Sequence, residues 1–122
     1  MPFAATLGIE TLAAAADEVR ARLAHSDAFT TTGGALHGGV IMALADACGG
    51  MCASFNLPKA ATGTTTIESK TNFLRAARGG NVDAVARPLH VGRTIIAIET
   101  EVCNDDGKLV AKVTQSQGVL RS

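Results

Sequence analysis

The chain has no tryptophan or tyrosine and only four phenylalanines among its 122 residues. Proteins that bind single-stranded nucleic acid stack its bases on aromatic side chains, so this sequence has little with which to do so. Its 11 basic residues (lysine and arginine) balance its 11 acidic residues, and the net charge is zero. No overall electrostatic field therefore attracts nucleic acid or a membrane surface, and we expect neither as a partner.

The chain also lacks a long apolar run, and residues 1–10 do not lead us to expect a secretory signal. No uncharged apolar run reaches the roughly 18 residues of a membrane-spanning helix. Residues 1–10 contain no basic region followed by an apolar core. The three cysteines, Cys48, Cys52 and Cys103, match no zinc-binding spacing and have no evident base nearby. Their odd number is typical of reduced thiols that pack as small apolar side chains. We expect a cytoplasmic protein without a metal or cofactor.

The length is that of one domain, spanning residues 1–122, and no repeat or linker divides it. Residues 62–76, 82–89, 94–103 and 109–120 are predicted as strands, because they are rich in β-branched residues or alternate, and turn residues separate them. Asn104–Gly107 is predicted as a hairpin turn, since Asp-Gly accepts the positive φ that such turns require. Successive strands with short turns predict an antiparallel meander.

The N-terminal part gives conflicting indications. Leu12–Ala24 is rich in alanine, which slightly favours a helix when propensity is considered alone. Alternation instead favours two short strands around a turn at residues 16–18; the alternating residues are Ile9 and Thr11, then Val19, Ala21 and Leu23. The family resemblance described below favours the strands, and we predict a hairpin.

Gly38–Ser54 has the composition of a helix buried on every side. Asp46 is its only charged residue, and Ser54 is its only other polar side chain. The helical neighbours of Asp46 cannot pair with a carboxylate, since they are Met42, Ala43, Gly49 and Gly50. Most helical aspartates face water, but a solvated face normally carries several polar residues. Because burying an unpaired carboxylate is costly, we predict a functional role for Asp46.

Gly38 and Gly39 begin this predicted helix, directly after His37. The first N–H groups of a helix have no partner within it, and glycine lets an oxyanion or a polarised carbonyl approach them. A histidine at this position commonly caps or packs against the helix, so a chemical role for His37 is secondary. One helix thus offers an electrophile-binding end and a single carboxylate, which indicates an active site.

The order of these motifs resembles that of hotdog-fold acyl-CoA thioesterases, and more narrowly the branch typified by the phenylacetic-acid-degradation thioesterase. The resemblance runs from about Thr30 to Leu120. It depends on His37-Gly38-Gly39, on Asp46 nine residues after the histidine, and on segments 66–80, 91–93, 99–101 and 106–111. It implies an α+β fold, with an antiparallel sheet of five to six strands wrapped around one long central helix, and hydrolysis of an acyl-CoA thioester.

The resemblance also implies roles for individual residues. The backbone N–H at the position of Gly38 polarises the thioester carbonyl, and the acid at the position of Asp46 acts as general base on water or as nucleophile. A hydroxyl on the strand after the helix, here Thr66, helps to position the water or the carboxylate. Close relatives often have an asparagine six residues before the histidine, where this chain has Thr31. The expected catalytic site therefore contains Asp46, Gly38, His37, Thr66 and Thr31.

Helix geometry supports the homodimer that the resemblance implies. Asp46 follows Gly38 by eight residues, which is about 12 Å along a helix that rises 1.5 Å per residue. A base must lie within hydrogen-bond reach of its water, itself next to the carbonyl carbon, so the two groups of one chain cannot comfortably serve one carbonyl. A second chain can bring its Asp46 to the first chain's Gly38, with two equivalent sites by symmetry. A dimer of dimers is the expected further assembly.

Basic residues are concentrated between Lys70 and Arg93: this segment contains five of them and only one acidic residue, Asp83. The phosphates of coenzyme A could accept charge-assisted hydrogen bonds from such residues, although each could equally be a solvated strand end. The preferred CoA-binding residues are Arg75, Arg78 and Arg93, mostly by resemblance.

Three functions other than acyl-CoA hydrolysis can be considered for the same sequence features. A hotdog hydratase or dehydratase would have the same fold, but the hydratase pattern of an Asp followed by Asn-Pro and a His is missing after Asp46. A non-catalytic acyl-CoA-binding protein stays open because Thr31 replaces the asparagine. A purely structural domain gives no reason to retain Asp46. The acyl group itself is not predicted.

Overall fold

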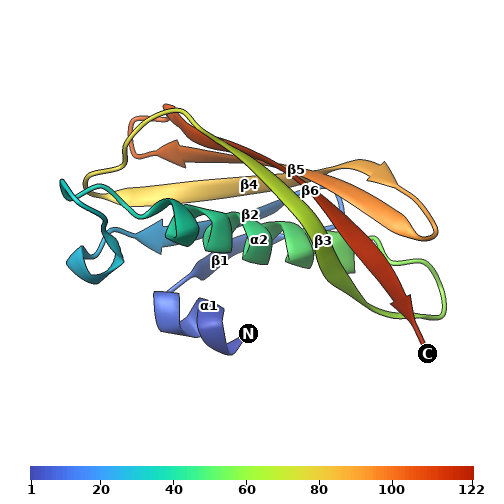
Figure 1. Ribbon diagram of the computed structural model, residues 1–122. Coiled ribbons are helices and arrows are strands. Elements are labelled where there is room, and N and C mark those ends of the chain that lie inside the picture. Colours follow the sequence, from blue (N-terminus) through green and yellow to red (C-terminus); the bar gives the residue numbers. More distant parts are fainter.

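The computed structural model describes all of residues 1–122 and consists of one six-stranded antiparallel sheet, one long helix and one short helix (Figure 1). In chain order the elements are α1 (Pro2–Leu7), β1 (Glu10–Ala14), β2 (Val19–Ala24), the 3-10 turn η1 (Asp27–Phe29), α2 (Gly38–Ser54), β3 (Ala61–Phe73), β4 (Asn81–Val91), β5 (Ile95–Asn104) and β6 (Leu109–Arg121). The sheet curves around α2, which contacts strands β2 to β6. This is the architecture that the resemblance implied.

The strand order, β1-β2-β4-β5-β6-β3, differs from the predicted meander. Strands β4, β5 and β6 do follow one another as antiparallel neighbours. β3 cannot pair with β4, however, because β2 occupies that edge: Val19–Ala24 pairs with residues 81–86. β3 pairs with β6 instead and forms one edge of the sheet. The segment Arg78–Gly80 therefore belongs to a crossing connection (Figure 1) and does not form a hairpin turn.

The N-terminal hairpin is confirmed, since β1 and β2 pair with each other. Val19, Ala21 and Leu23 are fully or almost fully buried against the core. Burying a valine or leucine side chain stabilises the fold by about 1.5–3 kcal/mol, which exceeds the helix preference of alanine, under about 1 kcal/mol per residue. On the opposite face, the guanidinium of Arg22 donates two hydrogen bonds to Asp83 of β4, at 2.7 and 3.0 Å.

Helix α1 has no counterpart among the elements predicted from the sequence. Pro2 suits its first turn because proline lacks an N–H that would need a partner there, and Gly8 ends it with a φ of 73°. Leu7 is the only buried residue of α1 and attaches it beside α2, on the side that the sheet leaves open (Figure 1). Neither helix has the length and apolar character needed to cross a bilayer.

Candidate active site

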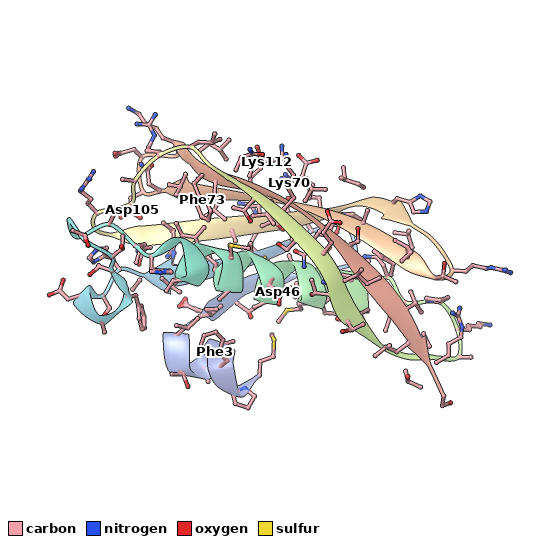
Figure 2. The ribbon with its side chains drawn as sticks, in the orientation of Figure 1. Phe3, Asp46, Lys70, Phe73, Asp105 and Lys112 are labelled. Atoms are coloured by element: carbon pink, nitrogen blue, oxygen red, sulfur yellow. The ribbon has the colours of Figure 1, made fainter.

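Asp46 lies midway along α2 and is exposed in the single chain (Figure 2). The prediction of a helix buried on every side is therefore wrong for one chain: the buried residues of α2 share one face, and they are Ile41, Leu44, Ala45, Cys48, Gly49, Cys52 and Ala53. The rest of the helix is apolar in composition because it carries small residues such as Ala43 and Ala47. Asp46 lines an open pocket of about 430 Å³ together with Thr64, Thr66 and Gln117.

One oxygen of the Asp46 carboxylate is held by hydrogen bonds. The Thr66 hydroxyl on β3 donates to Oδ1 at 2.6 Å, and Gln115 Nε2 on β6 donates to the same oxygen at 3.2 Å. Gln117 Nε2 in turn donates to the Thr66 hydroxyl at 2.7 Å. Asp46 Oδ2 accepts no hydrogen bond within the chain. The arrangement fixes the carboxylate and leaves one oxygen available, and it places Thr66 where the resemblance implied.

Gln115 and Gln117, each only 1% exposed, were not predicted as site residues. A signal was present, because both follow Val113 at alternate positions and so face the core in a regular strand. Gln115 fits because Gly49 of α2 has no side chain: a Cβ at Gly49 would lie 2.6 Å from Gln115 Cδ and closer still to Oε1. Since Gln115 Oε1 has no hydrogen-bond partner, the amide is retained at some cost. We name Asp46, Thr66, Gln115 and Gln117 the carboxylate network.

The start of α2 is built differently. His37 is the N-cap, and its Nδ1 accepts a hydrogen bond from the Gly39 N–H at 2.8 Å. The Gly38 N–H, at the first helical position, has no acceptor within the chain. The ring of Phe73 packs against Gly38, where a Cβ would come within 3.0 Å of it. The predicted electrophile-binding group is thus free, and His37 is a capping residue.

A bulge in β3 allows this one strand to contact both the middle and the start of α2. Thr66 and Phe73 are seven residues apart, so a regular strand would point them to opposite faces. The pairing of β3 with β6 shifts between Thr66 and Glu68, which leaves Ile67 as an extra residue. Thr66 can therefore contact Asp46 while Phe73 contacts Gly38.

The predicted CoA-binding arginines lie at two opposite ends of the folded molecule. Arg75 lines a pocket of about 500 Å³ beside Gly38, with Leu36, Ile41, Phe73, Leu74, Ala76 and Ala77. Arg78 lies close by in the chain, and its Nε donates to the Gly33 carbonyl at 3.5 Å. Arg93 lies in the turn between β4 and β5, at the opposite end of β4 (Figure 1). One chain therefore does not bring Arg93 to the other two.

Thr31 lies in the exposed loop before α2. Its backbone N–H donates to the Ala35 carbonyl at 2.8 Å, but its hydroxyl makes no hydrogen bond within the chain. The single chain thus gives Thr31 no contact with the carboxylate network.

The cysteines are poor nucleophiles in this environment. Burial raises the pKa of the Cys48 thiol to about 12, and burial also raises the pKa of Cys52 and of Cys103. All three are free thiols.

No group of three or more His, Cys, Asp or Glu side chains is placed to hold a metal ion. Asp46 is therefore the reactive side chain that the geometry favours.

Comparison with known proteins matches residues 33–111 to the Thioesterase superfamily. A protein of Saccharolobus solfataricus named as a candidate esterase is 38% identical over 98 residues, which are 80% of this chain and 69% of that protein. The 1,4-dihydroxy-2-naphthoyl-CoA hydrolase of Escherichia coli is 29% identical over 87 residues, or 71% of this chain and 63% of that enzyme. The crystal structure of a thioesterase from Haemophilus influenzae superposes with a TM-score of 0.91 at 28% identity, covering 98% of this chain and 82% of that one.

The matched segment includes Gly38, Asp46 and Thr66, and the superposition covers nearly the whole chain. The narrower resemblance to the phenylacetic-acid-degradation branch stays a prediction. The chain belongs to the thioesterase superfamily and has its hotdog fold.

Proposed function

We propose that this protein hydrolyses acyl-CoA thioesters to a free acid and CoA, with Asp46 as general base or nucleophile. The observation that carries the proposal is the hydrogen bonding of Asp46, in which Thr66 and Gln115 both donate to Oδ1 while Oδ2 stays unengaged. Membership of the superfamily supports thioester hydrolysis, and the activity in the name of the E. coli relative supports a CoA thioester as substrate.

In the base mechanism, Oδ2 of Asp46 removes a proton from water as the water oxygen attacks the thioester carbonyl carbon. The tetrahedral intermediate collapses by breaking the carbon–sulfur bond, and the CoA sulfur takes up the proton. In the nucleophile mechanism, Oδ2 attacks the carbonyl directly and expels CoA, and water then hydrolyses the mixed anhydride. In both, the bonds to Oδ1 keep the carboxylate in one orientation, which lowers the entropy lost on reaching the transition state.

The Gly38 N–H is the proposed donor to the thioester oxygen. It is unpaired and lies at the positive end of the α2 dipole, so it stabilises the negative charge that develops on that oxygen. Because Gly38 and Asp46 lie about 12 Å apart along one helix, the proposed site combines Gly38 of one chain with Asp46 of another.

The free edge of β3 is the proposed surface for this second chain. The strand has 13 residues and no neighbour beyond β6, whereas the other edge strand, β1, has five. A long edge strand presents a row of unpaired backbone groups that can pair with another strand. Thr64 and Thr66 of β3 also line the pocket that contains Asp46, so a copy paired along β3 would cover that carboxylate. A dimer of dimers remains the proposed larger assembly.

Arg75 and Arg78 are the proposed contacts for the CoA phosphates on the Gly38 side, because Arg75 lines the pocket beside Gly38. Arg93 can join such a site only from another chain. Arg87 is a weaker choice, since its guanidinium already donates to Glu18 at 2.6 Å.

The decisive experiment measures thiol release from a panel of acyl-CoA thioesters, with wild type compared to Asp46→Asn. Loss of hydrolysis with retained binding supports the proposal, whereas equal rates would exclude Asp46 as base or nucleophile. Label in the Asp46 carboxylate after a single turnover in ¹⁸O-labelled water would establish the nucleophile mechanism, in which water attacks the Asp46 carbon of the anhydride, because the base mechanism places label only in the free acid. Binding without hydrolysis by the wild type would favour the alternative of a non-catalytic acyl-CoA-binding protein.

The shared site has its own test. Mixed and reassociated Asp46→Asn and Gly38→Pro chains form some heterodimers with one intact site, so activity should reappear on mixing. No recovery, when heterodimers are shown to form, would contradict a site made from two chains.

A further inference from the structure

We propose that the apolar pocket between α1 and α2 binds the acyl group of the substrate, an inference that builds on the proposed function. The pocket has a volume of about 340 Å³. Asp46 is the only lining residue with a charged side chain, and the others are Met1, Pro2, Phe3, Ala4, Ile9, Ala43 and Ala47.

The position of Asp46 supports this assignment. It lines both the apolar pocket and the neighbouring pocket, whose lining is the more polar of the two because it includes Thr64, Thr66 and Gln117. A thioester that reacts at Asp46 has its carbonyl near this boundary, and its acyl group must continue into one of the two spaces. Apolar groups leave water most favourably for an apolar lining, and polar linings lose hydrogen bonds to water when such groups cover them. We therefore place the acyl group in the apolar pocket between α1 and α2.

The pocket is open because small residues face each other across it. Ala43 and Ala47 lie one turn apart on α2, and Ala4 lies on α1. Phe3 lines the same space yet is 65% exposed (Figure 2). Large apolar side chains exposed around a pocket are typical of ligand sites, because a bound apolar group removes them from water.

The size of the pocket limits the acyl group. Small-molecule sites range from about 300 to 1,000 Å³, so this pocket is among the smaller ones. With Phe3 and Met1 bounding it on the α1 side, it suits an acyl group of short or medium length rather than a long fatty chain. Phe3 and Ala43 are thus proposed to determine acyl-length specificity.

The test uses S-alkyl-CoA thioethers of increasing alkyl length, which have no carbonyl and resist hydrolysis, with calorimetric measurement of Kd. For the wild type we expect affinity to rise with alkyl length up to a limit. Ala43→Leu fills the pocket and should weaken the longest well-bound alkyl group about tenfold, while the ethyl thioether binds as before. Phe3→Ala removes a wall and should also weaken the preferred length about tenfold. Phe55→Ala is the matched control, because Phe55 is 50% exposed at the end of α2 and lines no pocket.

The assignment would be overturned if the wild-type Kd did not depend on alkyl length. It would also be overturned if both pocket variants bound the thioethers with the same Kd values as Phe55→Ala. Circular dichroism shows whether Ala43→Leu folds; if it does not, Phe3→Ala, an exposed substitution, decides. Hydrolysis by the same proteins separates this inference from the proposed function. Length-dependent binding without any hydrolysis refutes the function and retains the pocket, whereas hydrolysis whose length profile neither variant alters refutes the pocket alone.

Discussion

The middle and the start of α2 present chemical groups in contrasting ways. In the middle, a side chain is positioned by other side chains from distant strands, with Thr66 and Gln115 donating to Asp46. At the start, a backbone N–H is positioned by local structure, with His37 as the cap and Gly38 directly after it. The proposed role of the middle of α2 therefore depends on tertiary packing, and the proposed role of its start depends on a few consecutive residues.

This contrast also explains why each part tolerates different changes. Replacing a residue of the carboxylate network disturbs partners 20 to 69 positions away in the chain. At the start of α2 the partners are two residues apart.

Asp46→Asn should lower kcat/KM for the best acyl-CoA substrate by about 10²-fold or more, because the amide can neither remove a proton nor attack the carbonyl. Asparagine keeps a side-chain oxygen that can accept from Thr66 and Gln115, so the melting temperature should change little. Steady-state thiol release and a thermal melt measure the two effects. Full activity in this variant would remove Asp46 from the mechanism.

Gly38→Pro should lower kcat by about 10²-fold, the usual cost of losing one oxyanion donor. Proline is well tolerated at the first helical position and removes only the N–H. Gly38→Ala is the matched control, since it crowds the Phe73 ring in the same way but keeps the N–H. If the alanine and proline variants lose equal activity, crowding of Phe73 is the cause and the N–H is not the donor.

Gly49→Ala should destabilise the protein relative to Gly50→Ala by about 1–3 kcal/mol. A Cβ at Gly49 would overlap the amide of Gln115, which is buried and donates to Asp46, whereas a Cβ at Gly50 meets nothing within 4 Å. Both changes gain up to about 1 kcal/mol in helix propensity, so the difference isolates the contact with Gln115. Urea unfolding measures it, and equal stabilities would mean that Gln115 does not pack against α2 as described.

Much of the fold could be predicted from local patterns. Gly38–Ser54 is the helix that the composition indicated, and β6 begins at the predicted Leu109. The register of β3 could not be predicted, because an extra residue such as Ile67 leaves no pattern in a threonine-rich strand. The same applies to the place of β3 beside β6, which depends on β2 occupying the edge of β4.

The candidate site shows the same division. Asp46 and Gly38 could be proposed as site residues from residue type and spacing, which are local properties. The sequence did not identify Gln115 or Gln117, because their role depends on a strand far along the chain lying against the middle of α2. It also predicted apolar surroundings for Asp46, since small residues on the open side of a helix have the same composition as a buried face.

The smallest expected effect belongs to the cap at the start of α2. His37→Ala removes the acceptor of the Gly39 N–H and should lower the free energy of unfolding by about 1 kcal/mol. His37→Asn offers another capping acceptor and should retain most of that stability. Because the cap also orients the neighbouring Gly38 N–H, kcat should fall in the alanine variant and recover in the asparagine variant. A loss of kcat that asparagine does not restore, at unchanged stability, would instead give the imidazole of His37 a chemical role.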